Sequence, residues 1–451
     1  MSAPAPRAGE SRAAELGFWT CVSLVIGNMI GSGIFLLPAS LAPYGGISLV
    51  GWLISTVGAL LLAQVFCSLA RRAPLAGGPY AYTRLAFGDL AGFLMAWGYW
   101  ISVLAAVAAI AVAFISYLTI FFPSLASHPV QAALAALATI WLLTAVNVLG
   151  IRAGGRMQVV TTVLKILPLV ALVVFGWARF DPSHFVPFNP TGTSAFSAAT
   201  ATVSLTLWAF LGLESATIPA GNISDPARTI PRATLLGTVL TALLYVGTTV
   251  VVMGILTPAS LATSTAPFAD AAGALAGSWA GYAVGIGAVV SCFGALNGWI
   301  LIQGQIPLAL AADGLFPKVF SQVSANGTPV TALVISSVLV TLLVAANYTR
   351  SLVQLFTFSI LLATLSCLVP YLFSALAEWT LLRQEREASG GSRKTGSVLV
   401  AILAFLYSFW AIAGSGQEAV YWGFLLLMAG VPVYVWVKRG QAASRLEGQS
   451  S

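Results

Sequence analysis

The chain has 451 residues, of which 59% are hydrophobic and only 7% are charged, and its mean hydropathy is +0.93. Such values exclude an ordinary water-soluble domain and predict an all-α membrane protein. The formal net charge of +7 comes from scattered Lys and Arg residues, which indicates orientation signals beside anionic lipid and excludes a nucleic-acid-binding patch.

Apolar runs divide the chain into twelve predicted transmembrane helices, because a spanning helix needs about 20 mostly apolar residues. The first run carries no cleavage-type end, so we interpret it as a retained span and not as a signal peptide. In chain order the predicted spans cover residues 16–42, 46–70, 89–121, 129–149, 157–178, 196–219, 232–257, 279–312, 329–346, 351–383, 396–414 and 419–438.

The first run contains the sequence GNMIGSGIFLLP, which begins at Gly27 and ends at Pro38. An opened helix at membrane depth is tolerated only where it is buried in protein or lines a cavity, so this stretch predicts a ligand site. The alternative is a GxxxG packing face formed by Gly27 and Gly31. That alternative leaves Ser32 and Gly33 unexplained.

The sixth run contains a second interruption, LWAFLGLESAT, with Gly212 and Glu214 in an otherwise apolar stretch. Free N–H groups after Gly33 suit a carboxylate, and carbonyls at the ends of the preceding half-helices suit a cation. The two breaks together predict binding of a zwitterion, an α-amino acid or a close analogue. Their positions in spans one and six indicate two inverted five-helix repeats, at about 16–178 and 196–383, followed by two helices at 396–438.

Seventeen of the 20 Lys and Arg residues fall on one side of the predicted membrane, and cytoplasmic loops retain positive charge. We therefore expect cytoplasmic tails at 1–15 and 439–451, around a single transmembrane domain at 16–438. Arg179 and Arg350 fall on the other side, and Lys165 lies inside a span. The seventeen are Arg7, Arg12, Arg71, Arg72, Arg84, Arg152, Arg156, Arg228, Arg232, Lys318, Arg383, Arg386, Arg393, Lys394, Lys438, Arg439 and Arg445.

Five strings, taken together and in order, resemble the amino acid–polyamine–organocation (APC) superfamily, and within it the basic amino acid/polyamine antiporters of the arginine/agmatine type. They are GNMIGSGIF at 27–35, GGPYAYTRLAFG at 77–88, WAFLGLESAT at 208–217, SDPARTIPRA at 224–233 and AADGLFPKVFSQVSANGTPV at 311–330. The resemblance covers nearly the whole chain. It implies a five-plus-five inverted repeat with two trailing helices, which works by alternating access.

The resemblance also implies the residues of the substrate site. Ile30, Ser32 and Gly33 match a carboxylate-binding break, and Gly212 lies in the second break. The matching aromatic residues are Trp208, which would stack on the substrate, and Trp299, Tyr99 and Phe356 on helices eight, three and ten. The alternative for these four is that they are lipid-facing or interfacial aromatic residues.

Two positions depart from the arginine/agmatine pattern. Where that type has an asparagine and a serine, this chain has Val107 and Ala363. A guanidinium in an apolar pocket would lose hydrogen bonds worth about 1–3 kcal/mol each. These residues favour a neutral or apolar substrate side chain, whereas the resemblance favours arginine, agmatine or another cationic amino acid or polyamine.

Lys165 and Glu214 are the ionisable groups near mid-membrane. Lys165 lies roughly 13 Å beyond Arg156 along the helix, too deep to reach either surface comfortably. It either loads and sheds a proton during transport or acts as a fixed cation that holds helix five to carbonyls of the broken first helix. Glu214 either links helix six to its neighbours and senses protons, or is a protonated acid that satisfies unwound backbone.

These observations predict a secondary active amino-acid transporter, a permease or antiporter, in the cell inner or plasma membrane. An enzyme is not expected, because the spans contain no histidine and no nucleophile, metal or phosphate-loop motif. We expect no cofactor and no metal. The expected partners are a small amino-acid substrate and membrane lipid, with a proton and a homodimer left open. The remote alternative is a membrane sensor or scaffold that does not transport.

Overall fold

The structure is a computed structural model that describes residues 17–75, 77–149, 154–217, 220, 223, 225–324, 328–347, 350–389 and 395–449. The predicted tail at 1–15 lies outside these residues, as do Arg152, Arg393 and Lys394. The α-helices are α1 (Phe18–Met29), α2 (Gly33–Leu41), α3 (Ile47–Arg72), α4 (Pro79–Phe87), α5 (Asp89–Leu118), α6 (Ser124–Ser127), α7 (Pro129–Leu149), α8 (Gly154–Phe175), α9 (Ala195–Leu207), α10 (Pro226–Ile255), α11 (Pro258–Thr263), α12 (Pro267–Ala276), α13 (Ser278–Ala312), α14 (Val330–Ala346), α15 (Leu352–Ser389), α16 (Thr395–Gly414), α17 (Gln417–Met428) and α18 (Gly430–Gln449). The 3-10 helices are η1 (Ala42–Tyr44), η2 (Gly176–Arg179), η3 (Pro182–Phe185), η4 (Trp208–Phe210), η5 (Ser215–Thr217) and η7 (Lys318–Ser321).

The predicted all-helical membrane protein is confirmed. Eleven segments of the described chain are long and apolar enough to cross a membrane, and each coincides with a predicted span. The remaining predicted span, 329–346, corresponds to α14, an apolar helix of 17 residues. At 1.5 Å per residue α14 is about 26 Å long, slightly shorter than the hydrocarbon core of about 30 Å.

Three helices extend well beyond the apolar runs that predicted them. One is α18, which continues to Gln449, past the predicted 438. α10 begins at Pro226, before the predicted 232, because proline at the first helical position has the fixed backbone angle that a helix start requires. α15 continues to Ser389, past the predicted 383, and an ion pair between Arg383 Nε and Glu387 Oε1 at 3.0 Å supports its last turns. Hydropathy finds the membrane-embedded part of a helix, whereas capping and side-chain pairs decide where it ends.

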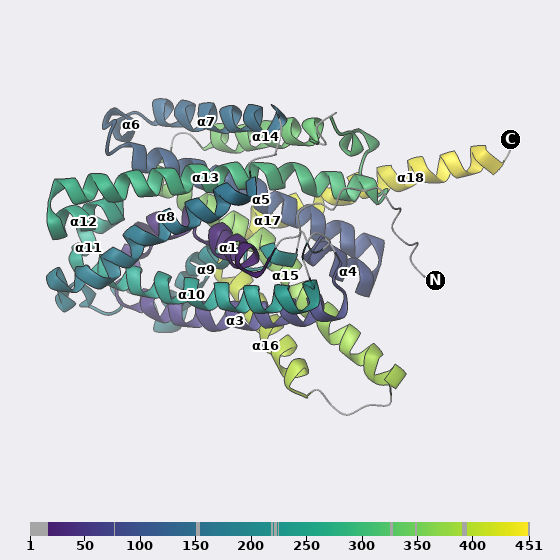
Figure 1. Ribbon diagram of the computed structural model, residues 1–451, viewed down its shortest axis with the longest axis horizontal. Helices are drawn as coiled ribbons and strands as arrows, with labels where there is room; N and C mark the ends of the chain where they lie inside the picture. The colour runs from purple at the N-terminus through teal and green to yellow at the C-terminus, as the bar shows by residue number, and fades with distance from the viewer. Residues whose placement is uncertain are drawn as a thin grey trace.

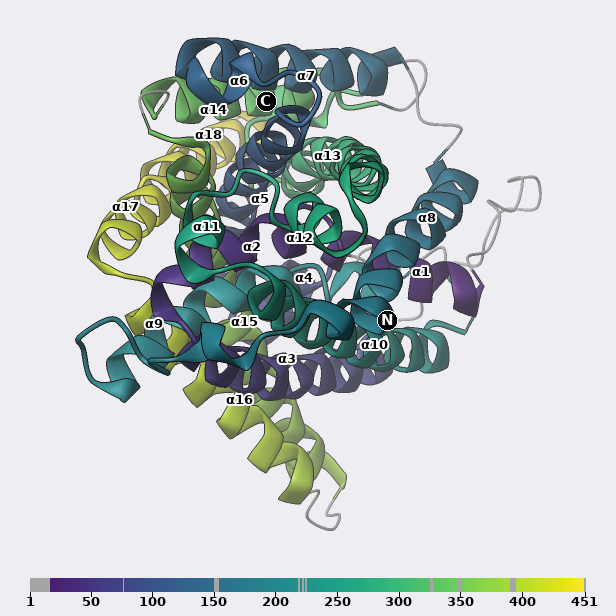
Figure 2. The ribbon, with the colours of Figure 1, turned by 90° about the vertical axis from the view of Figure 1, so that its left-hand side faces the viewer.

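Long helices run roughly parallel through the bundle, so the molecule has two ends (Figure 1). α4 and the C-terminal helix α18 lie toward one end, which we call the α18 end, whereas α6, α11 and α12 lie at the opposite, α6 end. Seen from the α6 end, α2 occupies the middle of the bundle (Figure 2). It contacts α5, α9, α10, α11, α12 and α15, so the interrupted first span is enclosed by other helices.

Small residues let the second and sixth spans approach closely. A Cβ atom on Gly51 of α3 would lie 2.3 Å from Thr202 Oγ1 of α9, so only glycine fits there. One turn further along α3, the hydroxyls of Ser55 and Thr206 form a hydrogen bond of 2.7 Å. This contact fixes the end of α9 immediately before the predicted break at Trp208.

Candidate functional site

The first span breaks where its sequence predicted. α1 ends at Met29, residues 30–32 form a bend, and α2 starts at Gly33. Gly31 N donates to Met29 O at 2.9 Å instead of continuing the helix to Gly27 O, which is thereby released. In the first turn of α2, Phe35 N donates to Ser32 O at 3.2 Å, which leaves the N–H groups of Gly33 and Ile34 without a carbonyl of their own helix to accept them. The break therefore offers acceptors on one side and donors on the other.

The second break lies against the first. Gly212 follows the short helix η4 with φ +100°, a backbone conformation that favours glycine. A Cβ atom on Gly212 would lie 3.2 Å from Asn28 Cβ, and one on Gly33 would lie 3.0 Å from Trp208 Nε1. The structure therefore brings Gly33, Trp208 and Gly212 together, as the sequence predicted.

Two buried polar atoms at this junction have no hydrogen-bond partner among the described residues. They are the hydroxyl oxygen of Ser32, which is 1% exposed, and the indole nitrogen of Trp208, which is 6% exposed. Both groups carry a hydrogen to donate, and burying such groups without an acceptor costs free energy. Their position beside the first turn of α2 makes a small region rich in donors.

Glu214 is fully buried and lies at the centre of a polar cluster. Its Oε1 accepts a hydrogen bond of 2.7 Å from Tyr99 Oη, and its Oε2 accepts bonds from Tyr371 Oη and from Gly212 N at 3.2 Å. The acid thus links the sixth span to α5 and α15. Sequence analysis missed Tyr371, although a buried acid requires donors and the string LVPYL places a tyrosine at this depth of α15.

Lys165 on α8 contacts the released carbonyls of the first break. Its Nζ, on a side chain only 3% exposed, donates to Gly27 O at 2.9 Å and to Ile30 O at 2.8 Å. A neutral amine has two N–H groups and an ammonium has three, so either form can make both bonds. Tyr245 Oη on α10 donates to Met29 O at 2.5 Å, a second contact to the break that sequence analysis missed.

The remaining predicted site residues lie in the same buried core. Trp299 follows Ala295 by one helical turn on α13, and a Cβ atom on Gly31 would lie 3.3 Å from Ala295 Cβ, so Trp299 shares the face directed at the break. The carbonyl of Ala363 accepts a bond of 2.8 Å from Ser102 Oγ. The side chains of Tyr99, Val107, Trp299, Phe356 and Ala363 are all at most 7% exposed, so none of the predicted aromatic residues faces lipid.

A large cavity lies at the α6 end, and none of the predicted site residues lines it. It has a volume of about 1680 Å³, and its lining includes Tyr44 just after α2, Arg350 before α15 and Glu418 at the start of α17. Its lining also reaches Leu205 on α9, three residues before Trp208. Three helical residues rise about 4.5 Å, so the cavity extends to within one turn of the break.

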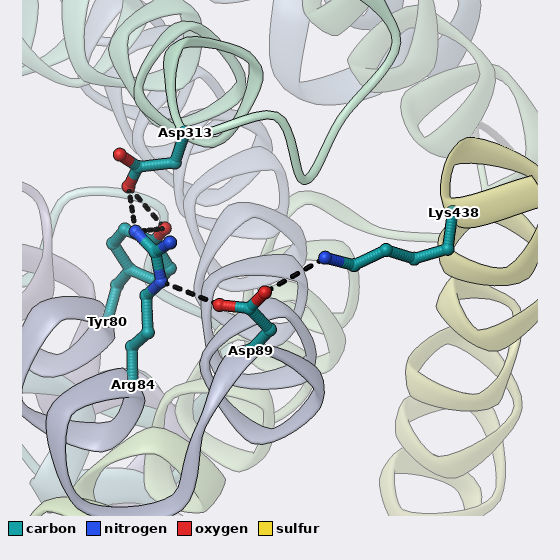
Figure 3. Close-up of polar contacts among 5 residues, drawn as sticks. All are labelled: Tyr80, Arg84, Asp89, Asp313 and Lys438. Atoms are coloured by element: carbon teal, nitrogen blue, oxygen red, sulfur yellow. Dashed lines mark hydrogen bonds and ion pairs between the residues drawn. The ribbon is translucent and has the colours of Figure 1, made fainter. Parts of the chain in front are cut away.

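Ion pairs link the helices at the α18 end (Figure 3). Arg84 of α4 lies between Asp89 of α5, with Nε–Oδ1 at 3.0 Å, and Asp313 after α13, with Nη1–Oδ2 at 2.8 Å. Lys438 of α18 pairs with Asp89 at 2.9 Å, and Tyr80 Oη donates to Asp313 at 2.5 Å. Burial and this bond to Asp313 raise the pKa of Tyr80, which keeps its hydroxyl protonated as a donor.

Comparison with known proteins identifies the family. A family model described as amino acid permease matches residues 16–436. The chain belongs to the amino acid permease family. This permease is 36% identical to the cadaverine/lysine antiporter of Escherichia coli K12 over 418 residues, which cover 90% of the chain and 91% of that relative. It is also 34% identical to the putrescine transporter PotE of Haemophilus influenzae over 424 residues, 94% of the chain and 97% of the relative.

The family settles the class of activity. The permease is a multi-pass membrane protein and a secondary transporter of the permease and antiporter type that acts on small molecules, and it is not an enzyme. Within the described residues no group of three or more His, Cys, Asp or Glu side chains is arranged to hold a metal ion. The ionisable residues near the site are Lys165, which contacts backbone carbonyls, and Glu214, which contacts tyrosine hydroxyls and the N–H group of Gly212.

Proposed function

We propose that this permease exchanges an amino acid or a related amine across the membrane and holds it at the two breaks. The observation that carries the proposal is the pair of unpartnered donors, Ser32 Oγ and Trp208 Nε1, beside the first turn of α2. Together with the N–H groups of Gly33 and Ile34 at the start of that turn they suit a substrate carboxylate. The carbonyls of Gly27 and Ile30 each have a second lone pair beside the bond from Lys165, and these lone pairs suit the substrate amino group.

The side-chain preference follows from the apolar residues around the site. Val107 and Ala363 are fully buried, and their side chains offer no partner for a guanidinium. We therefore propose a substrate whose chain is apolar where it meets these residues, first of all a neutral amino acid.

A second candidate is lysine or an unbranched diamine. The names of the relatives support it, since they transport cadaverine, lysine and putrescine. The methylene groups of such substrates are compatible with Val107 and Ala363, and Glu214 supplies a buried carboxylate near the break.

Competition in proteoliposomes separates the two candidates. Uptake of a labelled tracer by proteoliposomes that contain the purified protein is measured. The compounds compared as inhibitors of this uptake are arginine, agmatine, lysine, cadaverine, leucine, alanine and serine. Strong inhibition by leucine or alanine supports the neutral preference. Inhibition by lysine and cadaverine alone supports the second candidate, and dominant inhibition by arginine and agmatine contradicts the inference from Val107 and Ala363.

Coupling to protons is proposed through Lys165. A lysine that releases its proton during the cycle would let an inward proton gradient drive net uptake into empty liposomes, whereas a fixed cation at the break would leave obligate exchange. Replacing Lys165 by Gln keeps two N–H donors for Gly27 O and Ile30 O but cannot titrate. If wild-type uptake responds to the gradient, Lys165→Gln should lose that response and keep exchange; uptake that needs internal substrate at every pH contradicts proton coupling.

We further propose that the α18 end faces the cytoplasm of a cell inner or plasma membrane, with both termini on that side. Basic residues gather there, among them Arg72, Arg84 and Lys438, whereas Arg350 lines the cavity at the α6 end. Cysteines introduced at the two ends and labelled from outside intact cells test this orientation. We also propose that the protein contacts anionic lipid and forms a homodimer. Crosslinking in membranes tests the homodimer.

A further inference from the structure

A second, smaller cavity lies at the α18 end, among α3, α15 and α16 and away from the two breaks. Its volume is about 240 Å³. Its lining is mixed, with hydroxyl, amide and carboxylate groups together with two valines. The lining residues are Gln64, Val65, Ser68, Glu378, Gly396, Ser397 and Val400.

Glu378 supplies this cavity with an unpartnered carboxylate oxygen. The residue is 1% exposed, and its Oε2 pairs with Arg72 Nη1 at 2.5 Å. Its Oε1 is buried and has no hydrogen-bond partner among the described residues. Arg72 does not line the cavity, so Oε1 is the oxygen that remains for an occupant of the cavity.

The positive charge of Arg72 does not neutralise Glu378 alone. The guanidinium also pairs with Glu385, Nε to Oε1 at 3.0 Å, so one cation is shared between two carboxylates. A buried carboxylate oxygen without a hydrogen bond costs free energy. The cavity therefore favours an occupant that is positively charged and can donate hydrogen bonds.

We propose that this cavity binds a primary alkylammonium group. The three N–H donors of an ammonium can find acceptors among four groups of the lining, which are Glu378 Oε1, the Gln64 amide oxygen and the hydroxyls of Ser68 and Ser397. Val65 and Val400 offer an apolar wall for the attached methylene groups. A bare alkali-metal ion would meet the same oxygens but would gain nothing from the apolar wall of Val65 and Val400. The site goes beyond the transport proposal, because it shares no residue with the breaks.

Melting of the purified, detergent-solubilised protein tests the site with n-propylammonium chloride as the probe. Choline, sodium and potassium chlorides at equal ionic strength are the comparisons. Saturating probe should raise the melting temperature of the wild type by about 2–4 °C relative to choline. The rise should be lost in Glu378→Gln and in Gln64→Leu, and the second variant leaves the Arg72–Glu378 ion pair intact.

Two control variants make the result specific. Glu385→Gln removes the other partner of Arg72 without changing the lining of the cavity, so it should keep the rise. Gly33→Leu fills the first break and should also keep it, which separates this cavity from the transport site. A rise that survives Gln64→Leu and Glu378→Gln overturns the proposal. So does an equal rise with sodium or potassium, or no rise at all, which would mean that the cavity holds only water.

Discussion

Replacing Lys165 by Met should destabilise the permease, because it leaves two buried carbonyl groups without a hydrogen bond. The side chain lies within the bundle, and its Nζ donates to Gly27 O at 2.9 Å and to Ile30 O at 2.8 Å. Methionine has a similar length but no N–H, so both buried acceptors lose their hydrogen bond. At about 1–3 kcal/mol for each unsatisfied group, the expected loss is about 2–6 kcal/mol. A neutral amine in the wild type would place the loss at the lower end of this range.

The assay is thermal unfolding of the purified protein, followed by tryptophan fluorescence. Leu164→Met is the matched control, because Leu164 precedes Lys165 on the same helix and is 51% exposed on the outside of the bundle. The control should melt close to the wild type, and Lys165→Met should melt several degrees lower. Lys165→Gln, which keeps two donors, should recover part of the difference. A Lys165→Met protein that melts with the wild type would refute the argument that Lys165 holds the broken helix.

Three further outcomes follow from particular contacts. Gly33→Leu should abolish substrate binding, because even a Cβ atom there would lie 3.0 Å from Trp208 Nε1. The control Gly298→Ala should bind normally, because nothing lies within 4 Å of the new atom. Equal binding by both variants would show that the site is elsewhere. Tyr371→Phe removes one of three donors to Glu214 and should lower stability by about 1–3 kcal/mol in chemical unfolding, while an unchanged midpoint would contradict that role. Asp313→Asn should change the melting temperature little, because its side chain is 40% exposed and such ion pairs contribute about 0–1 kcal/mol, but it should increase labelling of cysteines placed at the α18 end during transport. Unchanged labelling would show that the ion-pair cluster plays no part in the transport cycle.

The cavity and the ion pairs describe one arrangement of the transporter. The cavity of about 1680 Å³ lies at the α6 end, whereas Arg84 and its partners connect α4, α5, α13 and α18 at the other end. A transporter that alternates access must exchange such an arrangement for its opposite. The partly exposed ion pairs at the α18 end are weak enough individually to be broken and remade during a cycle.

The sequence by itself determined the spans and the positions of both breaks. Hydropathy is a local property, and lipid requires each spanning segment to satisfy its own backbone, so apolar runs predict helices without knowledge of their neighbours. Glycine and serine at positions 31–33, and Gly212 beside Glu214, interrupt that rule locally. The exceptional depth of Lys165 was also visible in the sequence, as a basic residue that no loop could hold.

Only the tertiary structure decided which groups meet. Lys165 could have titrated alone or held the first helix, and its two carbonyl acceptors lie 138 and 135 residues away along the chain. Glu214 needed donors, but their identity as Tyr99 and Tyr371 depends on how α5 and α15 pack against the sixth span. The cavity at the α6 end and the unpartnered oxygen of Glu378 likewise arise between helices. Residue type sets what a side chain needs, but distant segments supply its partners, and their packing has no signature in the local sequence.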